Sequence, residues 1–224
     1  MVSMQTAQAV KKLGVLMLDT AFTRFVGDPG NPESWRPPVE IAIVKGADVD
    51  AVVRKAGAGR IDAFVEAGQK LVTDGCTVVT TTCGFLALHQ QRLADALGAE
   101  VYTSALLAVP KLRAAGETVG VLTFDAENLT PAHRAAAGFG DDVPVRGMAD
   151  DSHFRAWIEG WEQPEFARLR TEVVTEAAAL KKEHPAITAI VLECTNMGPF
   201  AEDVRRNVGI PAHGIVALVE RLRD

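Results

Sequence analysis

Two cysteines, Cys83 and Cys194, each close an apolar run that is typical of a buried strand. They lie 111 positions apart (194 − 83) in a chain of 224 residues, about half its length. A thiol is a weak acid, and its thiolate is a base and a nucleophile. Two thiols at equivalent positions of two halves therefore suggest one acid and one base that face each other across a cleft.

The residues around each thiol add to this chemistry. Each cysteine precedes a predicted helix, and the partial positive charge at a helix N-terminus favours thiolate over thiol. Backbone N–H, hydroxyl and amide groups at such a position are suited to bind a carboxylate. These groups come from Thr82 and Gly84 beside one thiol, and from Thr195 and Asn196 beside the other.

The sequence repeats itself around the cysteines. Residues 13–20 read LGVLMLDT and residues 119–126 read VGVLTFDA. A helical pattern precedes each cysteine, and residues 99–109 (AEVYTSALLAV) correspond to residues 210–219 (IPAHGIVALV). Three collinear correspondences in the same order indicate a duplicated unit.

Strands and helices alternate along both halves. Several strands are continuous Val, Ile and Leu runs, which suits parallel strands covered on both faces by helices. Strands are predicted at 13–18, about 40–45, 77–82, 100–103, 118–123, about 143–146, 187–193 and 210–213. Helices are predicted around 48–56, 58–74, 85–97, 105–115, 130–137, 164–183, 199–207 and 214–222.

This alternation predicts an α/β fold of two pseudo-symmetric, doubly wound lobes. Each lobe is expected to hold a mainly parallel four-stranded sheet flanked by helices, with the active site in the cleft between the lobes. The final strand and helix correspond to residues 100–115, so we expect the tail to cross back. The N-terminal lobe is predicted to comprise 1–112 plus 208–224, and the C-terminal lobe 113–207.

Two aspartates share the strand-end position of the thiols. In open parallel sheets, ligands bind beyond the carboxyl ends of the strands. Asp19, which Thr20 follows, and Asp125 fall at such ends. The same residues can simply cap the next segment, and that alternative stays open.

Arg24 and His213 are the remaining candidates. Arg24 begins a loop, 23–38, that is rich in Pro and Gly and is either a plain surface connection or a lid. As part of a lid, its guanidinium could pair with a substrate carboxylate. His213 lies at a strand end that the repeat directs toward the cleft, so a Cys–His hydrolase with Cys194 is an alternative reading.

Composition excludes several classes of function. The net charge of −6 argues against nucleic acid as a main partner, because binding it needs clustered Lys and Arg. No apolar run reaches the length of a membrane span, and residues 1–12 lack the apolar core of a signal peptide. Three cysteines cannot all pair, and Cys76 is too far from Cys83 for a metal-chelating turn. We expect Cys76 to pack as a small apolar residue. We also expect the thiols to be free and the protein to be located in a reducing cytoplasm.

The segments TTTCGF (80–85) and LECTNM (192–197), with Asp19-Thr20 after the first strand, resemble the aspartate/glutamate/hydantoin racemase superfamily. Residues 24–35 (RFVGDPGNPESW) further resemble a largely uncharacterised branch of it. The resemblance implies a two-lobed enzyme that needs no cofactor and no metal, with Cys83 and Cys194 as paired acid and base. One thiolate would remove a proton from the carbon next to a carboxylate or hydantoin carbonyl. The opposite thiol would return a proton to the other face, which makes the chain a racemase or epimerase.

Departures from the superfamily's pattern bear on the substrate. Asn196 stands where glutamate racemases carry histidine, which argues against a His-assisted amino-acid racemase. Four aromatic residues are available to line a bulkier or less polar pocket, namely Phe85, Trp35, Trp157 and Trp161. The expected partner is a small carboxylate, amino acid or hydantoin, and a homodimer is a common assembly for such enzymes. Segment 153–162 is the expected surface for a dimer contact or a lid.

Other activities stay open at this point. The superfamily includes decarboxylases of malonates and cis–trans isomerases of small dicarboxylates, and its architecture is shared by non-catalytic two-lobed binding proteins. By resemblance, the malonate decarboxylases match the second cysteine but lack the first. Cys83 therefore favours racemisation or isomerisation.

Overall fold

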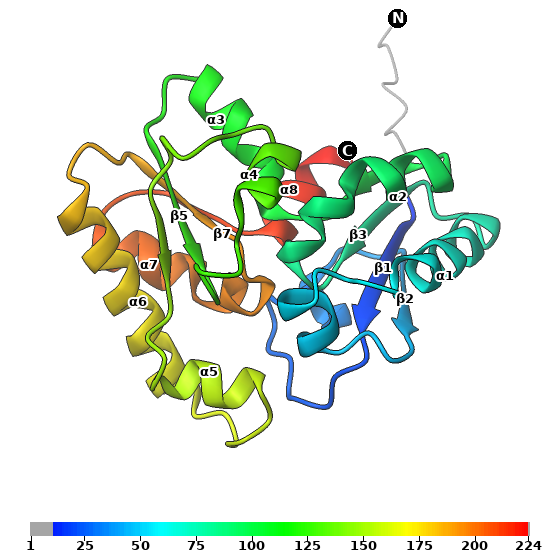
Figure 1. Ribbon diagram of the computed structural model, residues 1–224, viewed down its shortest axis with the longest axis horizontal. Coiled ribbons are helices and arrows are strands. Elements are labelled where there is room, and N and C mark those ends of the chain that lie inside the picture. Colours follow the sequence, from blue (N-terminus) through cyan, green and yellow to red (C-terminus); the bar gives the residue numbers. More distant parts are fainter. Residues whose placement is uncertain (1–10, 224) are drawn as a thin grey trace, which may run out of the picture.

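Two α/β lobes lie side by side in the computed structural model, which describes residues 11–223 (Figure 1). Residues 1–10, where the sequence lacks the apolar core of a signal peptide, and residue 224 lie outside the described residues. No helix within 11–223 is long and apolar enough to cross a membrane.

The first lobe is built on a parallel sheet with strand order β2-β1-β3-β4. The central strands are buried along almost their whole length, and helices cover them. The strands are β1 (Leu13–Leu18), β2 (Val39–Val44), β3 (Val78–Thr81) and β4 (Glu100–Tyr102). The helices are η1 (Pro32–Ser34), the π-helical turn η2 (Asp50–Arg54), α1 (Ile61–Thr73), η3 (Gly84–His89), α2 (Gln90–Leu97), η4 (Ala105–Ala108) and α3 (Val109–Ala114).

The second lobe repeats the order as β6-β5-β7-β8, again parallel throughout. The strands are β5 (Val119–Thr123), β6 (Val145–Gly147), β7 (Ala189–Leu192) and β8 (Ala212–His213). The helices are α4 (Pro131–Ala136), α5 (His153–Ile158), α6 (Phe166–Glu183), η5 (Thr195–Phe200), α7 (Ala201–Val208) and α8 (Ile215–Leu222). Two four-stranded parallel sheets of identical strand order confirm the predicted fold class and the duplication.

The glycine at the second position of the repeated segment, Gly14 in one half and Gly120 in the other, has a packing role in both lobes. A Cβ on Gly14 would lie 3.0 Å from the Leu71 side chain, which belongs to the buried face of α1. A Cβ on Gly120 would lie 2.5 Å from the Ile187 side chain. In each lobe the first strand thus allows a neighbouring apolar side chain to close against its backbone, which keeps the core dense.

The sheet pairing corrects one boundary of the predicted division into lobes. Residues 212–213 form β8, which pairs with β7, so they belong to the second sheet and not to the N-terminal lobe. Helix α8 beyond them is held against the first lobe. Its neighbour Arg223, fully buried, donates to the carbonyls of Lys11 and Pro38 at 3.0 and 2.8 Å. The C-terminal part of the chain therefore returns to the first lobe only after β8.

Candidate active site

Each thiol lies where a central strand gives way to a short 3-10 helix. Cys83 follows β3 and precedes η3, and its backbone is extended, with φ −148° and ψ 116°. Cys194 follows β7 and precedes η5 in the same manner. Both side chains are almost buried, with 9% and 8% of their surface exposed. The two loops occupy equivalent places in the repeat, one in each lobe.

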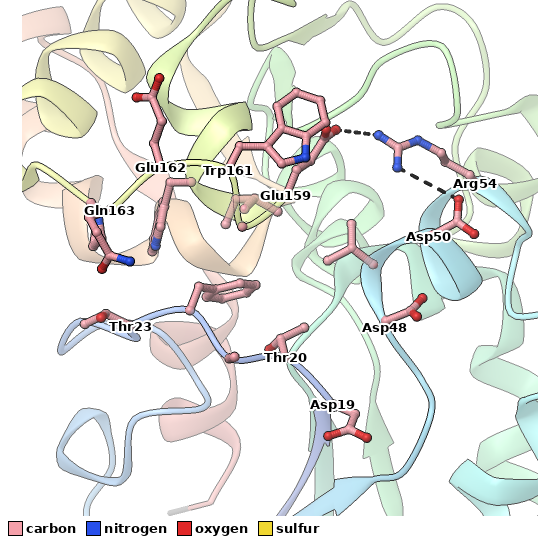
Figure 2. A pocket seen from close by; sticks show the side chains of 17 residues that line it. Asp19, Thr20, Thr23, Asp48, Asp50, Arg54, Glu159, Trp161, Glu162 and Gln163 are labelled. Atoms are coloured by element: carbon pink, nitrogen blue, oxygen red, sulfur yellow. Dashed lines mark hydrogen bonds and ion pairs between the residues drawn. The ribbon is translucent and has the colours of Figure 1, made fainter.

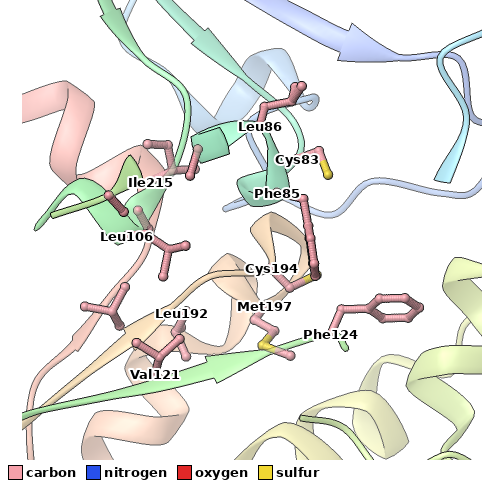
Figure 3. Packing of buried hydrophobic residues seen from close by; sticks show 14 of the residues in the cluster. Cys83, Phe85, Leu86, Leu106, Val121, Phe124, Leu192, Cys194, Met197 and Ile215 are labelled. Atoms are coloured by element: carbon pink, nitrogen blue, oxygen red, sulfur yellow. The ribbon is translucent and has the colours of Figure 1, made fainter. Parts of the chain in front are cut away.

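Both thiols line one cavity between the lobes, about 380 Å³ in volume when the part open to solvent is included. Most of its wall is apolar, and Figure 3 shows Phe85 and Phe124 among the side chains that pack beside the cysteines. Both lobes contribute to the lining, which consists of Leu18, Phe22, Arg24, Val49, Val53, Thr82, Cys83, Gly84, Phe85, Phe124, Ile158, Glu193, Cys194, Thr195 and Asn196. The cavity is therefore lined by seven of the predicted catalytic and substrate-binding residues that lie beside the strand ends, and also by the predicted substrate-binding residue Arg24.

Direct contacts between the two cysteine loops fix their separation. The Thr195 hydroxyl donates to the Thr82 carbonyl across the lobes at 2.8 Å. A Cβ on Gly84 would lie 2.3 Å from both the carbonyl and a carboxyl oxygen of Glu193. Only glycine permits this approach, so Gly84 brings the lobes together around the thiols.

Arg24 is tied into a buried network. Its guanidinium donates to both Asp28 carboxyl oxygens at 2.9 and 3.1 Å and to the Thr20 hydroxyl at 2.9 Å. Asp28 also accepts from the Asn196 amide at 2.7 Å. Burial raises the pKa of Asp28, while the charge of Arg24 opposes that rise. Arg24 therefore orders the loop that carries it and, through Asp28, positions Asn196 beside the second thiol.

The thiols are harder to ionise than their positions suggest. Burial, and then the Glu193 carboxyl, raise the pKa of Cys83 to about 12, although N–H groups of η3 favour the thiolate. Burial and Glu193 also raise the pKa of Cys194 well above its ordinary value. The expectation that the helix N-termini favour thiolates is thus outweighed, because the desolvation of a closed cavity opposes any charge. Burial therefore favours the neutral form of both thiols.

Glu193 is a site residue that the sequence analysis missed. It is fully buried, and burial raises the pKa of its carboxyl to about 7. The Thr123 hydroxyl donates to its Oε2 at 2.6 Å, whereas its Oε1 is buried without a hydrogen-bond partner. The available signal was an acidic residue within the apolar run Ile-Val-Leu-Glu, directly before a thiol. An ionisable carboxyl buried directly after a buried strand rarely serves stability alone.

Asp19 and Thr20 lie in a larger outer pocket of about 1160 Å³, which Figure 2 shows. The Asp19 carboxylate accepts from the Gly46 N–H at 3.0 Å and pairs with Lys45 at 3.5 Å. Three residues, namely Phe22, Val49 and Ile158, line both this pocket and the inner cavity. The outer pocket therefore adjoins the inner cavity.

The predicted aromatic set is divided among several places. Phe85 lines the inner cavity, while Trp157 and Trp161 line the outer pocket. Trp157 is buried and Trp161 is 74% exposed. Trp35 lies elsewhere, where its indole N–H donates to the Pro29 carbonyl at 2.9 Å. Segment 153–162 thus packs helix α5 inward and exposes only its end.

Asp125 and His213 lie outside both pockets. Asp125 accepts from the N–H and the side-chain amide of Asn128 at 3.1 and 2.8 Å and lies 3.6 Å from Arg155. His213 is half-buried in β8, and burial lowers its pKa. Their contact with substrate stays a prediction. Residues 11–223 contain no group of three or more His, Cys, Asp and Glu that could hold a metal ion.

Comparison with curated proteins gives one relative at 30% identity over 215 residues, the dimethylsulfoniopropionate lyase of Durusdinium sp. clade D. The aligned part is 91% of this chain and 71% of that enzyme. Dimethylsulfoniopropionate lyase 5 of Emiliania huxleyi (strain CCMP1516) is 26% identical over 227 residues, which are 95% of this chain and 45% of the relative. The chain thus spans about half the length of that relative. No protein-family model matches the chain.

Solved structures support the fold at low identity. An unliganded arylmalonate decarboxylase has a TM-score of 0.58 at 17% identity, covering 90% of this chain and 86% of its own. The allantoin racemase of Klebsiella pneumoniae has a TM-score of 0.60 at 16% identity, with 95% and 87% covered. The aspartate racemase of Picrophilus torridus has a TM-score of 0.56 at 11% identity, with 90% and 87% covered. The chain therefore belongs to the family of the Durusdinium dimethylsulfoniopropionate lyase, and it has the fold of the aspartate/glutamate/hydantoin racemase superfamily.

Proposed function

We propose that the chain is an enzyme that removes a proton from the carbon next to a carboxylate, with Cys83 or Cys194 as the base and no cofactor. The observation that carries this proposal is the convergence of both thiols, from matching loops of the two lobes, on one buried apolar cavity. Free, buried cysteines at one cavity have no packing reason to be paired in this way, because either lobe could use any small apolar residue there.

A carbon acid of this kind needs stabilisation of the negative charge that develops on its carboxylate. Donors fixed before the reaction are the main means of supplying it. The starts of η3 and η5 present backbone N–H groups beside the thiols, and those of Phe85 and Leu86 already favour a negative charge at Cys83. Closure around the cavity excludes water, which strengthens these contacts.

We propose β-elimination as the outcome, the reaction type that the names of the relatives indicate. A thiolate takes the α-proton of a carboxylate such as dimethylsulfoniopropionate, and the electron pair forms the bond between the α- and β-carbons. The bond from the β-carbon to sulfur breaks with both electrons on sulfur, which releases neutral dimethyl sulfide and acrylate. The thiol then returns its proton to solvent. Family membership and the apolar wall of the cavity support this outcome.

Racemisation is the second candidate, and the presence of two thiols favours it. An elimination needs one base, whereas inversion at a carbon needs a base on one face and an acid on the other. Cys83 and Cys194 fit that division of labour. Elimination and racemisation share the first proton transfer. They differ in the next step, in which either the sulfide leaves the β-carbon or a proton returns to the α-carbon.

Incubation in D₂O separates the two outcomes. The purified protein is given dimethylsulfoniopropionate, with dimethyl sulfide measured in the headspace, and a panel of chiral carboxylates, amino acids and hydantoins, with α-deuterium measured by mass spectrometry. Release of dimethyl sulfide supports elimination, and α-deuterium with loss of optical rotation supports racemisation. Neither signal across the panel, with the thiols shown to be free, would overturn the proposal.

A further inference from the structure

Most of the side-chain donors around the inner cavity already have acceptors within the protein. The guanidinium of Arg24 donates to both carboxyl oxygens of Asp28. The Asn196 amide also donates to Asp28, at 2.7 Å. The Thr195 hydroxyl donates to the Thr82 carbonyl at 2.8 Å. A carboxylate that enters the cavity therefore has to draw on backbone N–H groups and on any side-chain donor that is still free.

Glu193 differs from these residues. Among the described residues that line the cavity, it alone has a buried side-chain polar atom without a hydrogen-bond partner, its carboxyl Oε1. A Cβ on Gly84 would lie 2.3 Å from that oxygen, so Oε1 lies against the loop that carries Cys83. The whole Glu193 side chain is buried. An unpartnered oxygen in such a place is costly, and a ligand that completes its hydrogen bonding removes that cost.

The other carboxyl oxygen shows where the neutral acid carries its proton. Oε2 of Glu193 accepts from the Thr123 hydroxyl at 2.6 Å, and the oxygen of that hydroxyl accepts from the Asp125 N–H at 3.4 Å. Thr123 therefore gives its own hydrogen to Glu193, and Oε2 serves as an acceptor. In the protonated acid the hydrogen is thus on Oε1, as a donor that has no acceptor among residues 11–223.

We propose that the protonated carboxyl of Glu193 is a catalytic hydrogen-bond donor, which binds the substrate carboxylate through Oε1 and stabilises the negative charge that develops there as the α-proton leaves. This inference rests on the proposed function, since it adds a residue to the same proton abstraction. The α-proton still passes to a thiolate, and the proton of Glu193 stays on Oε1. A donor fixed in a closed cavity before the reaction is the most effective kind for such a charge.

A bound carboxylate should keep Glu193 protonated. Burial raises the pKa of the Glu193 carboxyl to about 7, and the Asp125 carboxyl also raises it. A second carboxylate in the same buried space adds a like charge, which raises that pKa further, so the two groups hold one proton between them. Binding of a carboxylate at pH 8 should therefore take up a proton from solvent. The charged and titratable groups that face Glu193 or its nearest neighbours are Arg24, Asp28, Cys83, Asp125, Arg155 and Cys194.

A neutral Glu193 also suits the base. After burial, the charge of Glu193 is the strongest influence that raises the pKa of Cys83 and of Cys194. Protonation of Glu193 removes that opposition, so the active form combines a protonated Glu193 with one thiolate. Above about pH 7 the protonated acid becomes rarer while the thiolate becomes commoner, and the amount of the active form levels off.

Binding of two matched probes tests the donor without turnover. The compound 4-methylpentanoate has the shape of dimethylsulfoniopropionate with a C–H group in place of the sulfur, and 4-methylpentanamide has the same shape without the charge. Titration calorimetry of the full chain at pH 8, in buffers of different ionisation enthalpy, should show uptake of about one proton with the carboxylate and none with the amide. Glu193→Gln should bind the carboxylate without uptake, because its amide N–H groups donate but do not titrate. Glu183→Gln, which makes the same change on exposed α6, should keep the uptake.

The pH dependence of turnover tests the same donor during the reaction. Dimethyl sulfide release, or α-deuterium exchange in D₂O, is measured as kcat/KM between pH 6 and pH 9. The wild-type protein should level off above about pH 7, whereas Glu193→Gln should continue to rise by about tenfold for each pH unit as the thiolate forms. Glu193→Met keeps the length of the side chain without a donor and should be about 10²–10³-fold slower than Glu193→Gln. If Glu193 acted only by repelling a thiolate, the two variants would behave alike.

The proposal would be overturned by a wild-type protein that takes up no proton with 4-methylpentanoate at pH 8 or does not bind it. Uptake retained in Glu193→Gln, or equal rates in Glu193→Gln and Glu193→Met, would overturn it as well. If thermal unfolding shows that neither variant folds, the comparison of carboxylate with amide on the wild-type protein decides the question alone. Proton uptake without turnover of any substrate in the panel would leave the donor standing and refute the proposed function instead.

Discussion

Replacing Glu193 by glutamine should change how the stability of the protein depends on pH. The carboxyl of Glu193 has an ordinary pKa of 4.5 in the unfolded chain, and burial raises it to about 7 in the folded protein. The folded state therefore binds this proton more tightly than the unfolded state. The stabilisation that results is complete below pH 4.5 and is lost as the pH rises through about 7. At 1.36 kcal/mol for each tenfold change in proton affinity, the loss is about 3 kcal/mol.

Urea unfolding in the presence of reductant, followed by tryptophan fluorescence, to which the buried Trp157 contributes, measures this loss. Glutamine is close in shape to the protonated acid and does not titrate. The unfolding free energies of the wild-type protein and Glu193→Gln should therefore agree at pH 4.5 and separate by about 3 kcal/mol at pH 8, with glutamine the more stable. Titrating groups that do not interact with Glu193 are common to both proteins and cancel in the difference. A difference that does not vary with pH, or that favours the wild-type protein at pH 8, would refute the reasoning.

Three other changes test the site and the fold. Of Cys83→Ser and Cys194→Ser, the variant that removes the base should lower dimethyl sulfide release and α-proton exchange by about 10²–10⁴-fold, because a hydroxyl is a far weaker acid, while thermal unfolding shows an intact fold; both rates unchanged in a variant would exclude that thiol as base, and unchanged rates in both variants would refute the proposed base. Gly84→Ala places a Cβ 2.3 Å from Glu193 and should lower both activity and Tm, whereas Gly140→Ala meets only a flexible side chain at 3.3 Å and serves as its control. Arg223→Ala removes a fully buried guanidinium that donates to three backbone carbonyls and should cost about 3 kcal/mol in urea unfolding; a loss below 1 kcal/mol would show that Arg223 is not what holds α8, whose Glu220 also pairs with Arg36.

The fold was accessible from sequence because its determinants are local and repeated. Every predicted strand overlaps a strand of the structure, since Val, Ile and Leu runs between polar breaks mark buried parallel strands. Helix α5 (His153–Ile158) was not predicted as a helix, being six residues long and short of a clear apolar period. The pairing of β8 with β7 was misplaced because two residues carry too little pattern to choose between sheets.

The electrostatics of the site were not accessible in the same way. The position of Cys83 before a helix is visible in the sequence, whereas the burial that raises its pKa depends on side chains from both lobes. Arg24 resembled a residue free to meet a carboxylate, yet Asp28, four residues later, neutralises it in the folded loop. Desolvation and pairing are properties of the closed cavity, and the order of residues along the chain does not state them.

The duplication also shows where the two halves of the site differ. Thr82 and Glu193 occupy the same position of the repeat, directly before each thiol. The Thr82 hydroxyl accepts from the Leu18 N–H at 3.0 Å, and Glu193 accepts from the N–H of Phe124, which corresponds to Leu18 in the second half. The equivalent backbone N–H is thus bound by a neutral hydroxyl in the first lobe and by an ionisable carboxyl in the second. Inversion of a stereocentre in both directions would be served by matched surroundings for the two thiols. A single ionisable group on one side instead suits a reaction that runs in one direction, in which one thiol takes the proton and a sulfonium group departs as a neutral sulfide. This asymmetry supports elimination over racemisation.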